Sequence, residues 1–487
     1  MNLAPAFGRA WSTVRAPAAI LIVGLAVAAY APAVFHAHGF AMGDFKAFYC
    51  SARAVLHHEN PYSAVPLGAC ESQPAPWPLF VARQGAVLPA PLPGYLIGLF
   101  TIVAWLPFQA AVVVWLLALI AATISAIAIL ARVLNLDPWN LAVGLSLILV
   151  ANALVIGQIV PIAMLGIALA ALGARRRSAA LVGCGSALAF FEPQVGIAVA
   201  LVCALLSRRF ALVVAVVAVA LLLISVTVLG LSENVEYVRT VLPAQALAEL
   251  HAAIQYSLSW ILAGLGMSAG WALRIGQLWW LAMLGAAAWF ARSPHARAKP
   301  EIAVLAAPAF TVVGGPYLHI HHVALAVPAA LWLASTPGRA PWIRIAAAVA
   351  ICVPLLDIFI MMGRIGFALP LAFVCVVASW LGAAYGRGAI AGLWSALAAV
   401  VAVWLVALAF IVGGFGFSGS ASMQQLSPAT AQASWAQFVA THYVATGWPI
   451  WLVKAPTWFG VLATAIGLMA AARGYGISRH ASGKGVV

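Results

Sequence analysis

Charge is scarce in this sequence of 487 residues. Only 7% of the residues are charged, ten of them acidic, whereas 65% are hydrophobic. Soluble globular proteins carry about 45–50% apolar and about 25% charged residues. A soluble core cannot hide this much apolar surface, so a cytoplasmic enzyme is excluded. At about 20 residues per span, the length accommodates roughly a dozen helices. The composition therefore predicts an all-α polytopic membrane protein.

Motifs of nucleotide and redox chemistry are missing too. The sequence holds no P-loop, dinucleotide-binding glycine pattern, HExxH or GxSxG in a suitable context. Nucleotide-driven pumping and soluble dehydrogenase chemistry are therefore unsupported. The six cysteines show no CxxC or metal-type spacing. Cys50 and Cys70 share one polar loop, and they either form a disulfide, if that loop is extracytoplasmic, or stay free thiols.

The excess of positive charge indicates membrane topology and not nucleic-acid binding. The net charge is +14, and no basic face or aromatic RNA motif accompanies it, so we expect no nucleic-acid partner. Clusters of Lys and Arg mark cytoplasmic loops. They predict a single integral membrane domain, 1–487, with about 12–14 helices. Its parts are a first helix (1–35, with a cleaved signal peptide as the alternative), an outer loop (36–90), a helical core (91–335) and C-terminal helices (336–487) with an outer loop (416–454).

The same rule predicts where polar joints lie. A break at Leu106-Pro107 divides the apolar stretch 91–131, and two hairpins follow with joints at Gly157-Gln158 and Glu192-Pro193-Gln194. Arginine clusters flank both hairpins, so both joints point outward, to the side of the loop 36–90. The segment 232–260 is expected to be another outer loop.

Because only ten acids exist, elimination narrows the candidates for acid–base chemistry. Three acids lie near apparent helix ends: Asp137, Glu301 and Asp357. Three more are expected in the exposed loop 232–260: Glu233, Glu236 and Glu249. Asp44, Glu59, Glu71 and Glu192 remain. Asp44 follows the first helix, where it either caps the next helix or acts as a general base at the mouth of a cavity.

Three histidines gather at the outer end of a helix: His319, His321 and His322. A zinc site would need further ligands of matching geometry, and no acid lies nearby in sequence. Hydrogen bonding to a phosphate or a sugar hydroxyl is the favoured interpretation, and packing in an interfacial aromatic belt is the alternative.

Several motifs, in order, resemble a known family. Residues 44–49 read D-F-K-A-F-Y and are followed by Ala52, Leu56 and Asn60-Pro61-Tyr62. Later segments are Pro91-Leu92-Pro93, Gly157-Gln158, Pro193-Gln194, Ser257-Leu258 and 316–322. This set resembles glycosyltransferase family 87, membrane enzymes of the GT-C superfamily that use polyprenol-phosphate sugars. The resemblance spans roughly residues 40–335.

The resemblance implies a GT-C-type fold with a functional first extracytoplasmic loop, no metal and no cofactor. Asp44 would be the catalytic base, His322 with His321 would lie at the donor phosphate, and Gln158 and Gln194 would line the cavity. His319, Tyr49 and Tyr62 are further candidates for donor or acceptor binding. Glu192 stands where the family usually has lysine, so the phosphate is expected to meet another cation. The candidates are Arg53, Arg239, Arg364 and Lys454.

The predicted function is inverting transfer of a sugar from a polyprenyl-phosphate donor to a hydroxyl of a glycolipid or lipid-linked glycan. Mannose is the predicted sugar, with arabinofuranose or another hexose as the alternative. The predicted place is a bacterial plasma membrane, among membrane lipids, with the active site on the outer, periplasmic face. A transporter or flippase of lipid-linked sugars is the rival hypothesis, and a structural subunit without catalysis is the third.

Overall fold

The computed structural model describes residues 41–74, 87–146, 149–252, 254–336, 351, 426–427, 429–442 and 448–481. Within these ranges the chain is helical, and its only bridges are two isolated ones, Ser63 with Thr430 and Gln255 with His319. The helices in chain order are α2 (Gly43–Leu56), α3 (Ala64–Glu71), α4 (Gly94–Ala104), α5 (Phe108–Leu134), α6 (Pro138–Ser146), α7 (Leu149–Ile156), α8 (Val160–Arg176), α9 (Ala179–Ala189), α10 (Pro193–Leu206), α11 (Arg208–Glu236), η1 (Tyr237–Val241), α12 (Leu242–Ala248), α13 (Leu258–Gly264), α14 (Ala269–Ala291), α15 (Pro294–Ala298), α16 (Pro300–Thr311), η2 (Ile320–Ala326), α17 (Val327–Ser335), α22 (Ala431–His442) and α23 (Trp448–Ala481).

The helical prediction is confirmed for this part of the chain. Three helical stretches are long and apolar enough to cross a membrane: Phe108–Leu134, Arg208–Ala248 and Lys454–Arg473. Shorter apolar helices accompany them, including α4, α9, α10 and α16. The total of 12–14 spans and the division into parts stay predictions. The first helix (1–35), Arg364 and most of 336–425 lie outside the described residues.

The centre of the bundle is built on small residues. Helix α8 packs along α9, with α5 and α16 on its other sides. A Cβ added at Gly166 would lie 2.3 Å from the backbone nitrogen of Ala189, and one at Gly185 would lie 2.3 Å from that of Ala170. Two backbones can approach this closely only where side chains are absent, as in other membrane helix pairs. The pair therefore forms a rigid base under the two joints that precede and follow it.

The expected break at Leu106-Pro107 and both expected joints are present. Helices α4 and α5 are separate, the first joint lies between α7 and α8, and the second lies between α9 and α10. The segment 232–260 differs from its prediction as a loop, because it is helical up to Ala248. Helix α11 bends at Gly230 (φ 79°, ψ 171°), and the Asn234 side chain donates to the Gly230 carbonyl (2.6 Å). This bend lets the helical path continue through η1 and α12 over the joints.

The segment that begins with α2 is anchored covalently. Cys50 of α2 and Cys70 of α3 are joined by a disulfide, the first of the two alternatives for this pair. A carboxyl oxygen of Glu71, a buried side chain, accepts a hydrogen bond from the backbone N–H of Leu88 (2.8 Å). Helix α2 is thereby tied to α3, and α3 to the segment that leads into α4.

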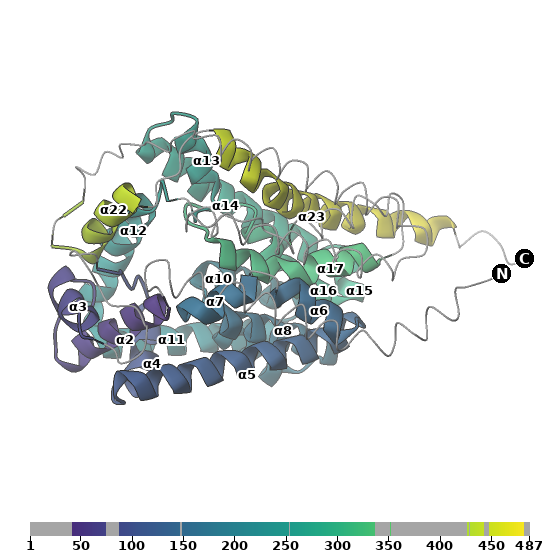
Figure 1. The fold of residues 1–487 in the computed structure, drawn as a ribbon. Helices are drawn as coiled ribbons and strands as arrows, with labels where there is room; N and C mark the ends of the chain where they lie inside the picture. The colour runs from purple at the N-terminus through teal and green to yellow at the C-terminus, as the bar shows by residue number, and fades with distance from the viewer. Residues whose placement is uncertain are drawn as a thin grey trace, which may run out of the picture.

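Segments far apart in sequence close the structure (Figure 1). Helix α22 lies beside α12 and α3, and helix α23 runs along α15, α16 and α17. Two backbone hydrogen bonds join the start of α22 to the start of α3, from Ala64 to Ala429 (3.0 Å) and from Ala431 to Tyr62 (3.3 Å). Helix α22 therefore packs on the side of α3 and α12, whereas α23 covers α15, α16 and α17.

Candidate active site

A cavity of about 580 Å³ opens among the joints, the α2 segment and α12. Most of its lining is apolar, from residues such as Phe48, Leu92, Ile197 and Leu242. Its polar and ionisable lining residues are Asp44, Gln158, Glu192, Gln194, Tyr237, Gln245, Glu249, Gln277, Trp280, Tyr317, His319, His321, His322 and Trp435. Asp44, Gln158, Glu192, Gln194 and the three histidines were candidates from the sequence, and the fold brings all seven to one cavity.

Asp44 is held at the cavity wall by its neighbours on α2. The Met42 N–H donates to the carbonyl of Val155 at the end of α7 (2.8 Å), which fixes the start of the helix. The buried ring of Phe45 stacks on Phe108 and Trp115, with centroid separations of 6.1 and 5.6 Å. Asp44 itself lies in the first turn, where the helix dipole favours a negative charge.

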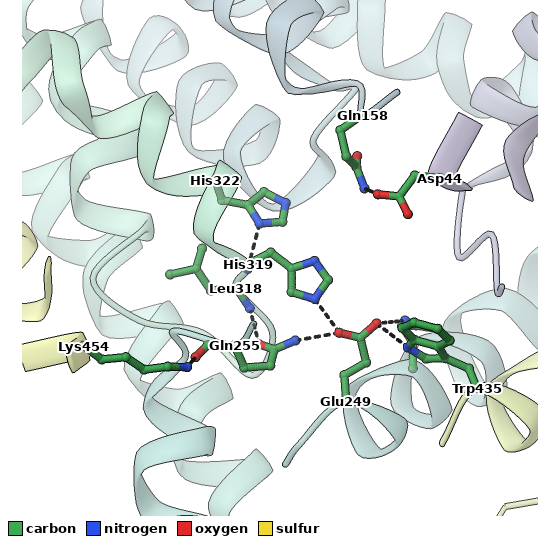
Figure 2. Close-up of polar contacts among 10 residues, drawn as sticks. Asp44, Gln158, Glu249, Gln255, Leu318, His319, His322, Trp435 and Lys454 are labelled. Atoms are coloured by element: carbon green, nitrogen blue, oxygen red, sulfur yellow. Dashed lines mark hydrogen bonds and ion pairs between the residues drawn. The ribbon is translucent and has the colours of Figure 1, made fainter. Parts of the chain in front are cut away.

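Gln158 is the direct partner of Asp44 (Figure 2). Its side-chain N–H donates to a carboxylate oxygen of Asp44 at 2.6 Å. The alternative role, capping of a helix, is not seen, because the N-cap of α2 is Met42 and it makes no side-chain cap bond. Gly157 permits the approach: its φ is +80°, and a Cβ there would lie 2.5 Å from the Cβ of Phe45. Such a backbone conformation favours glycine.

The environment makes Asp44 a better base than an exposed aspartate. Burial raises the pKa of Asp44 from 3.8 to about 6, against the opposing effect of the Gln158 hydrogen bond. The charge of His319 lowers this pKa and that of Glu249 raises it, so these groups act on one another across the cavity. A carboxyl that titrates near pH 6 is mostly ionised at neutral pH and accepts a proton more readily than one at 3.8.

His322 has both ring nitrogens engaged by the protein. Its Nδ1 accepts the backbone N–H of His319 (2.9 Å), and its Nε2 lies 3.0 Å from a carboxylate oxygen of Glu192. Because Nδ1 is an acceptor here, the proton lies on Nε2 and is donated to Glu192. Glu192 precedes α10 and forms part of the second joint. At this joint an acid therefore holds a histidine.

Glu249 is the most highly connected polar side chain of the cavity, and the sequence analysis placed it wrongly. It was expected in an exposed loop, yet only 3% of it is exposed, because α12 folds its end over the cavity. One oxygen accepts from Gln245 and Trp435, each at 2.9 Å, and the other accepts from Gln255 at 3.1 Å and contacts the ring of His319. Figure 2 shows this group across from Asp44 and Gln158.

Charge compensation keeps Glu249 ionised. Burial alone would raise its pKa, but the adjacent His319 charge and the hydrogen bonds from His319, Gln255 and Trp435 outweigh that effect and lower the pKa. Tyr317, whose ring centroid lies 4.6 Å from that of His319, shows the opposite behaviour. Burial and three surrounding carboxylates raise the pKa of Tyr317, so it remains a neutral phenol.

Other candidates from the sequence do not line the cavity. Tyr49 donates to the carbonyl of Leu106 (2.9 Å), and Tyr62 donates to that of Leu92 (2.8 Å), so both hydroxyls support the loops around the site. Arg53 lies 3.3 Å from the ring of His57, away from the cavity. Arg364 lies outside the described residues.

The two remaining cation candidates also point elsewhere. Arg239 is exposed on η1. Lys454 is completely buried, with its ammonium 4.0 Å from the centre of the Trp260 ring and 4.6 Å from that of Tyr256, and it donates to the backbone carbonyl of Gln255. The lysine therefore acts on the cavity through Gln255. Among the described residues, no group of three His, Cys, Asp or Glu side chains is placed to hold a metal ion.

Sequence reasoning missed Glu249, Gln245 and Gln255 as residues of the site. One local pattern was available for the first two: Gln245 and Glu249 are four residues apart, which places them on one face of a helix. The contacts of Glu249 with Trp435 and of Gln255 with Lys454 span 186 and 199 residues. Local periodicity carries no information about such contacts.

Comparison with known proteins places this cavity in a family. The model of glycosyltransferase family 87 matches residues 93–314, which include Gln158, Glu192 and Glu249. No curated protein matches the chain, and no solved structure does. Asp44, the three histidines and Trp435 lie outside the matched residues but on the walls of the same cavity. The order of motifs along the chain and the family match lead to one conclusion: this protein is a member of glycosyltransferase family 87.

Proposed function

We propose that this glycosyltransferase moves a sugar, with mannose as the first candidate, from a polyprenyl-phosphate donor to a hydroxyl of a glycolipid or lipid-linked glycan. The observation that carries the proposal is the Asp44 carboxylate, bonded to Gln158 on the wall of a largely apolar cavity. An apolar lining suits a donor whose long lipid stays in the membrane. A carboxylate that titrates near pH 6 suits proton removal from a hydroxyl.

The proposed reaction is a single inverting displacement. An acceptor hydroxyl oxygen bonds to C1 of the sugar, and the bond between C1 and the phosphate oxygen breaks on the opposite side. The hydroxyl proton passes to Asp44, and the polyprenyl phosphate leaves with the bonding electron pair. Gln158 keeps the carboxylate oriented toward the cavity, since its N–H holds one oxygen at 2.6 Å. Charged groups that face the leaving phosphate stabilise its negative charge.

The proposed location is the outer face of a bacterial plasma membrane. Disulfides persist in oxidising compartments and are rare in the cytosol, and the Cys50–Cys70 disulfide joins the helix that carries Asp44 to its neighbour. The arginine clusters at Arg175–Arg177 and Arg208–Arg209 lie at the opposite ends of the hairpins from the two joints. Both observations favour a cavity that opens away from the cytoplasm.

Sugar transfer in membranes tests the proposal. Membranes that contain the wild-type chain, Asp44→Asn or Glu59→Gln receive labelled polyprenyl-phosphate mannose, and the extractable lipid is analysed for a new glycosidic bond. Glu59 is an exposed acid of the same segment, so its variant is the matched control. We expect transfer by the wild type and by Glu59→Gln, and a loss of at least about 100-fold in Asp44→Asn, as is typical when a general base is removed.

Other outcomes separate the rival functions. Equal transfer by the wild type and Asp44→Asn would remove Asp44 from catalysis. Movement of the labelled lipid across the membrane without a new bond would favour a flippase. Absence of transfer from mannose, with transfer from an arabinofuranose or another hexose donor, would correct the sugar and leave the reaction class intact.

A further inference from the structure

The contacts of Glu249 form a second ionic centre on the cavity wall, separate from Asp44. A carboxylate has about four acceptor positions, and all four of those on Glu249 are used, by Gln245, Trp435, Gln255 and His319. A side chain whose acceptor positions are filled by the protein is not free to bind a sugar hydroxyl or take up a proton from substrate. Its role must therefore be exerted through one of these partners.

Among those four partners, only His319 is ionisable. An ionised carboxylate that is withdrawn from water requires a counter-charge, and the His319 ring in contact with it supplies one when it is protonated. His319 also lines the cavity, whereas Gln255 lies behind it and carries the contact on to Lys454. The charge that compensates Glu249 is therefore presented on the cavity surface.

The backbone around His319 is held in place by the same network. The Gln255 side chain accepts the N–H of Leu318 (2.9 Å), and the Tyr256 N–H donates to the Leu318 carbonyl (2.7 Å). The ammonium of Lys454 then holds the Gln255 carbonyl from behind. The position and orientation of one imidazole are thus fixed by groups from three separate parts of the chain (Figure 2).

We propose that Glu249 is a positioning residue that holds His319 as a charged imidazolium, and that this imidazolium is the fixed counter-charge for the phosphate of the donor. The inference rests on the proposed function for the identity of that phosphate. Glu249 does not touch substrate; it acts through His319. Glu249 and His319 together perform the role that a lysine or arginine has at other phosphate sites.

Other ionisable groups also face His319 and enter any pH dependence. They are Asp44 on α2, Glu192 before α10, Glu249 after α12, and Tyr317, His321 and His322 on its own segment. Three of these are carboxylates, which disfavour an incoming phosphate. For this reason the test compares variants with the wild type at each pH and does not depend on the wild-type profile alone.

Binding of a polyprenyl phosphate that carries no sugar tests the proposal without sugar transfer. The full-length chain in detergent is titrated with this lipid and with the uncharged polyprenol of the same length. The variants are Glu249→Gln, His319→Gln and the double variant, with Glu233→Gln as the matched control because this acid is exposed on α11. Elution as a single monodisperse peak establishes that each variant is folded.

We expect the wild type and the control to prefer the phosphate lipid over the polyprenol. Glu249→Gln should lose about tenfold or more of this preference at pH 7.5, the effect of one charged hydrogen bond. Binding of the uncharged polyprenol should stay unchanged in Glu249→Gln, because that lipid carries no phosphate for the pair to bind. His319→Gln should lose the preference at every pH, and the double variant should be no weaker than His319→Gln.

The opposite results overturn the proposal. An unchanged preference in Glu249→Gln and His319→Gln would show that the phosphate binds elsewhere. An equal loss of both lipids, the same at every pH, would show that Glu249 only supports the fold. If the wild type binds the phosphate lipid as expected but transfers no sugar, the proposed function fails while this inference stands. If transfer occurs and the variants bind phosphate normally, the inference fails while the function stands.

Discussion

The hydrogen bond between Gln158 and Asp44 gives the sharpest quantitative prediction. Replacement of Gln158 by leucine removes a donor that lies 2.6 Å from the carboxylate, and with it the largest effect that opposes burial. A hydrogen bond to a charged group contributes about 1.5–3 kcal/mol, which corresponds to a pKa change of about 1–2 at 1.36 kcal/mol per unit. The pKa of Asp44, now about 6, should therefore rise to about 7–8 in the variant.

The sign of the effect on activity follows from the role of Asp44 as a base. Only the ionised carboxylate accepts the hydroxyl proton, so activity appears as the pH rises through the pKa of Asp44. At pH 7 the ionised fraction should fall from about 0.9 to about 0.1–0.5, and kcat/KM should drop about 2- to 10-fold. At pH 9 most of this loss should disappear, because the carboxyl is then ionised in both proteins.

The assay is a pH–rate profile of kcat/KM between pH 5 and 9.5 for the wild type, Gln158→Leu and Gln194→Leu. Gln194 lines the same cavity, and its replacement leaves the bond between Gln158 and Asp44 in place. We therefore expect the acid limb of Gln194→Leu to stay near pH 6, whatever its maximal rate. A limb that does not move in Gln158→Leu, or a loss of equal size at pH 7 and pH 9, would refute this reasoning and assign Gln158 to substrate binding alone.

Three further predictions concern the support of the site. Gly157→Ala should fold but transfer no sugar. A left-handed backbone costs a residue with a side chain about 1–2 kcal/mol, and the new Cβ would lie 2.5 Å from the Cβ of Phe45. Normal transfer by the purified variant would contradict this. The disulfide joins cysteines 20 residues apart, so its reduction should destabilise the segment that carries Asp44 by about 3 kcal/mol. Reductant should therefore speed limited proteolysis of the wild type but not of Cys50→Ser. Equal proteolysis of both proteins before and after reduction would contradict this. Burial raises the pKa of Glu71 from 4.5 to about 8. The contribution of Glu71 to stability is therefore complete below about pH 4.5 and is lost as the pH rises through 8. Glu71→Gln should flatten the dependence of Tm on pH in this range, and an unchanged dependence would argue against a protonated Glu71.

The composition and the positions of proline and glycine were enough to predict much of the fold. The shortage of charge identified a helical membrane protein, and the proline and glycine positions located the break before α5 and the joints on either side of α8 and α9. These features are local, because a helix ends where proline, glycine or a polar turn interrupts an apolar run. The joint residues Gln158 and Glu192 could therefore be placed on one side of the bundle before their contacts were known.

The other half of the site depends on contacts that no local pattern reports. Glu249 was set aside because the segment 232–260 was expected to be an exposed outer loop, and only the folding of α12 over the cavity buries it. His319 was grouped with its neighbours as a cluster, whereas His319 and His322 have different partners, Glu249 for the first and Glu192 for the second. The identity of a partner depends on long-range packing, which the sequence of one segment does not encode.

The distance along the chain between Glu249 and its partners sets an order in time. A ribosome that adds about 5–20 residues per second needs about 10–40 s to proceed from Glu249 to Trp435, 186 residues later. Lys454, which secures Gln255, emerges later still. Until α22 and α23 have been synthesised and have packed, the carboxylate lacks one of its donors and the His319 segment lacks its rear support. A nascent chain that already contains the whole family-matching region has therefore not yet assembled this wall of its active site.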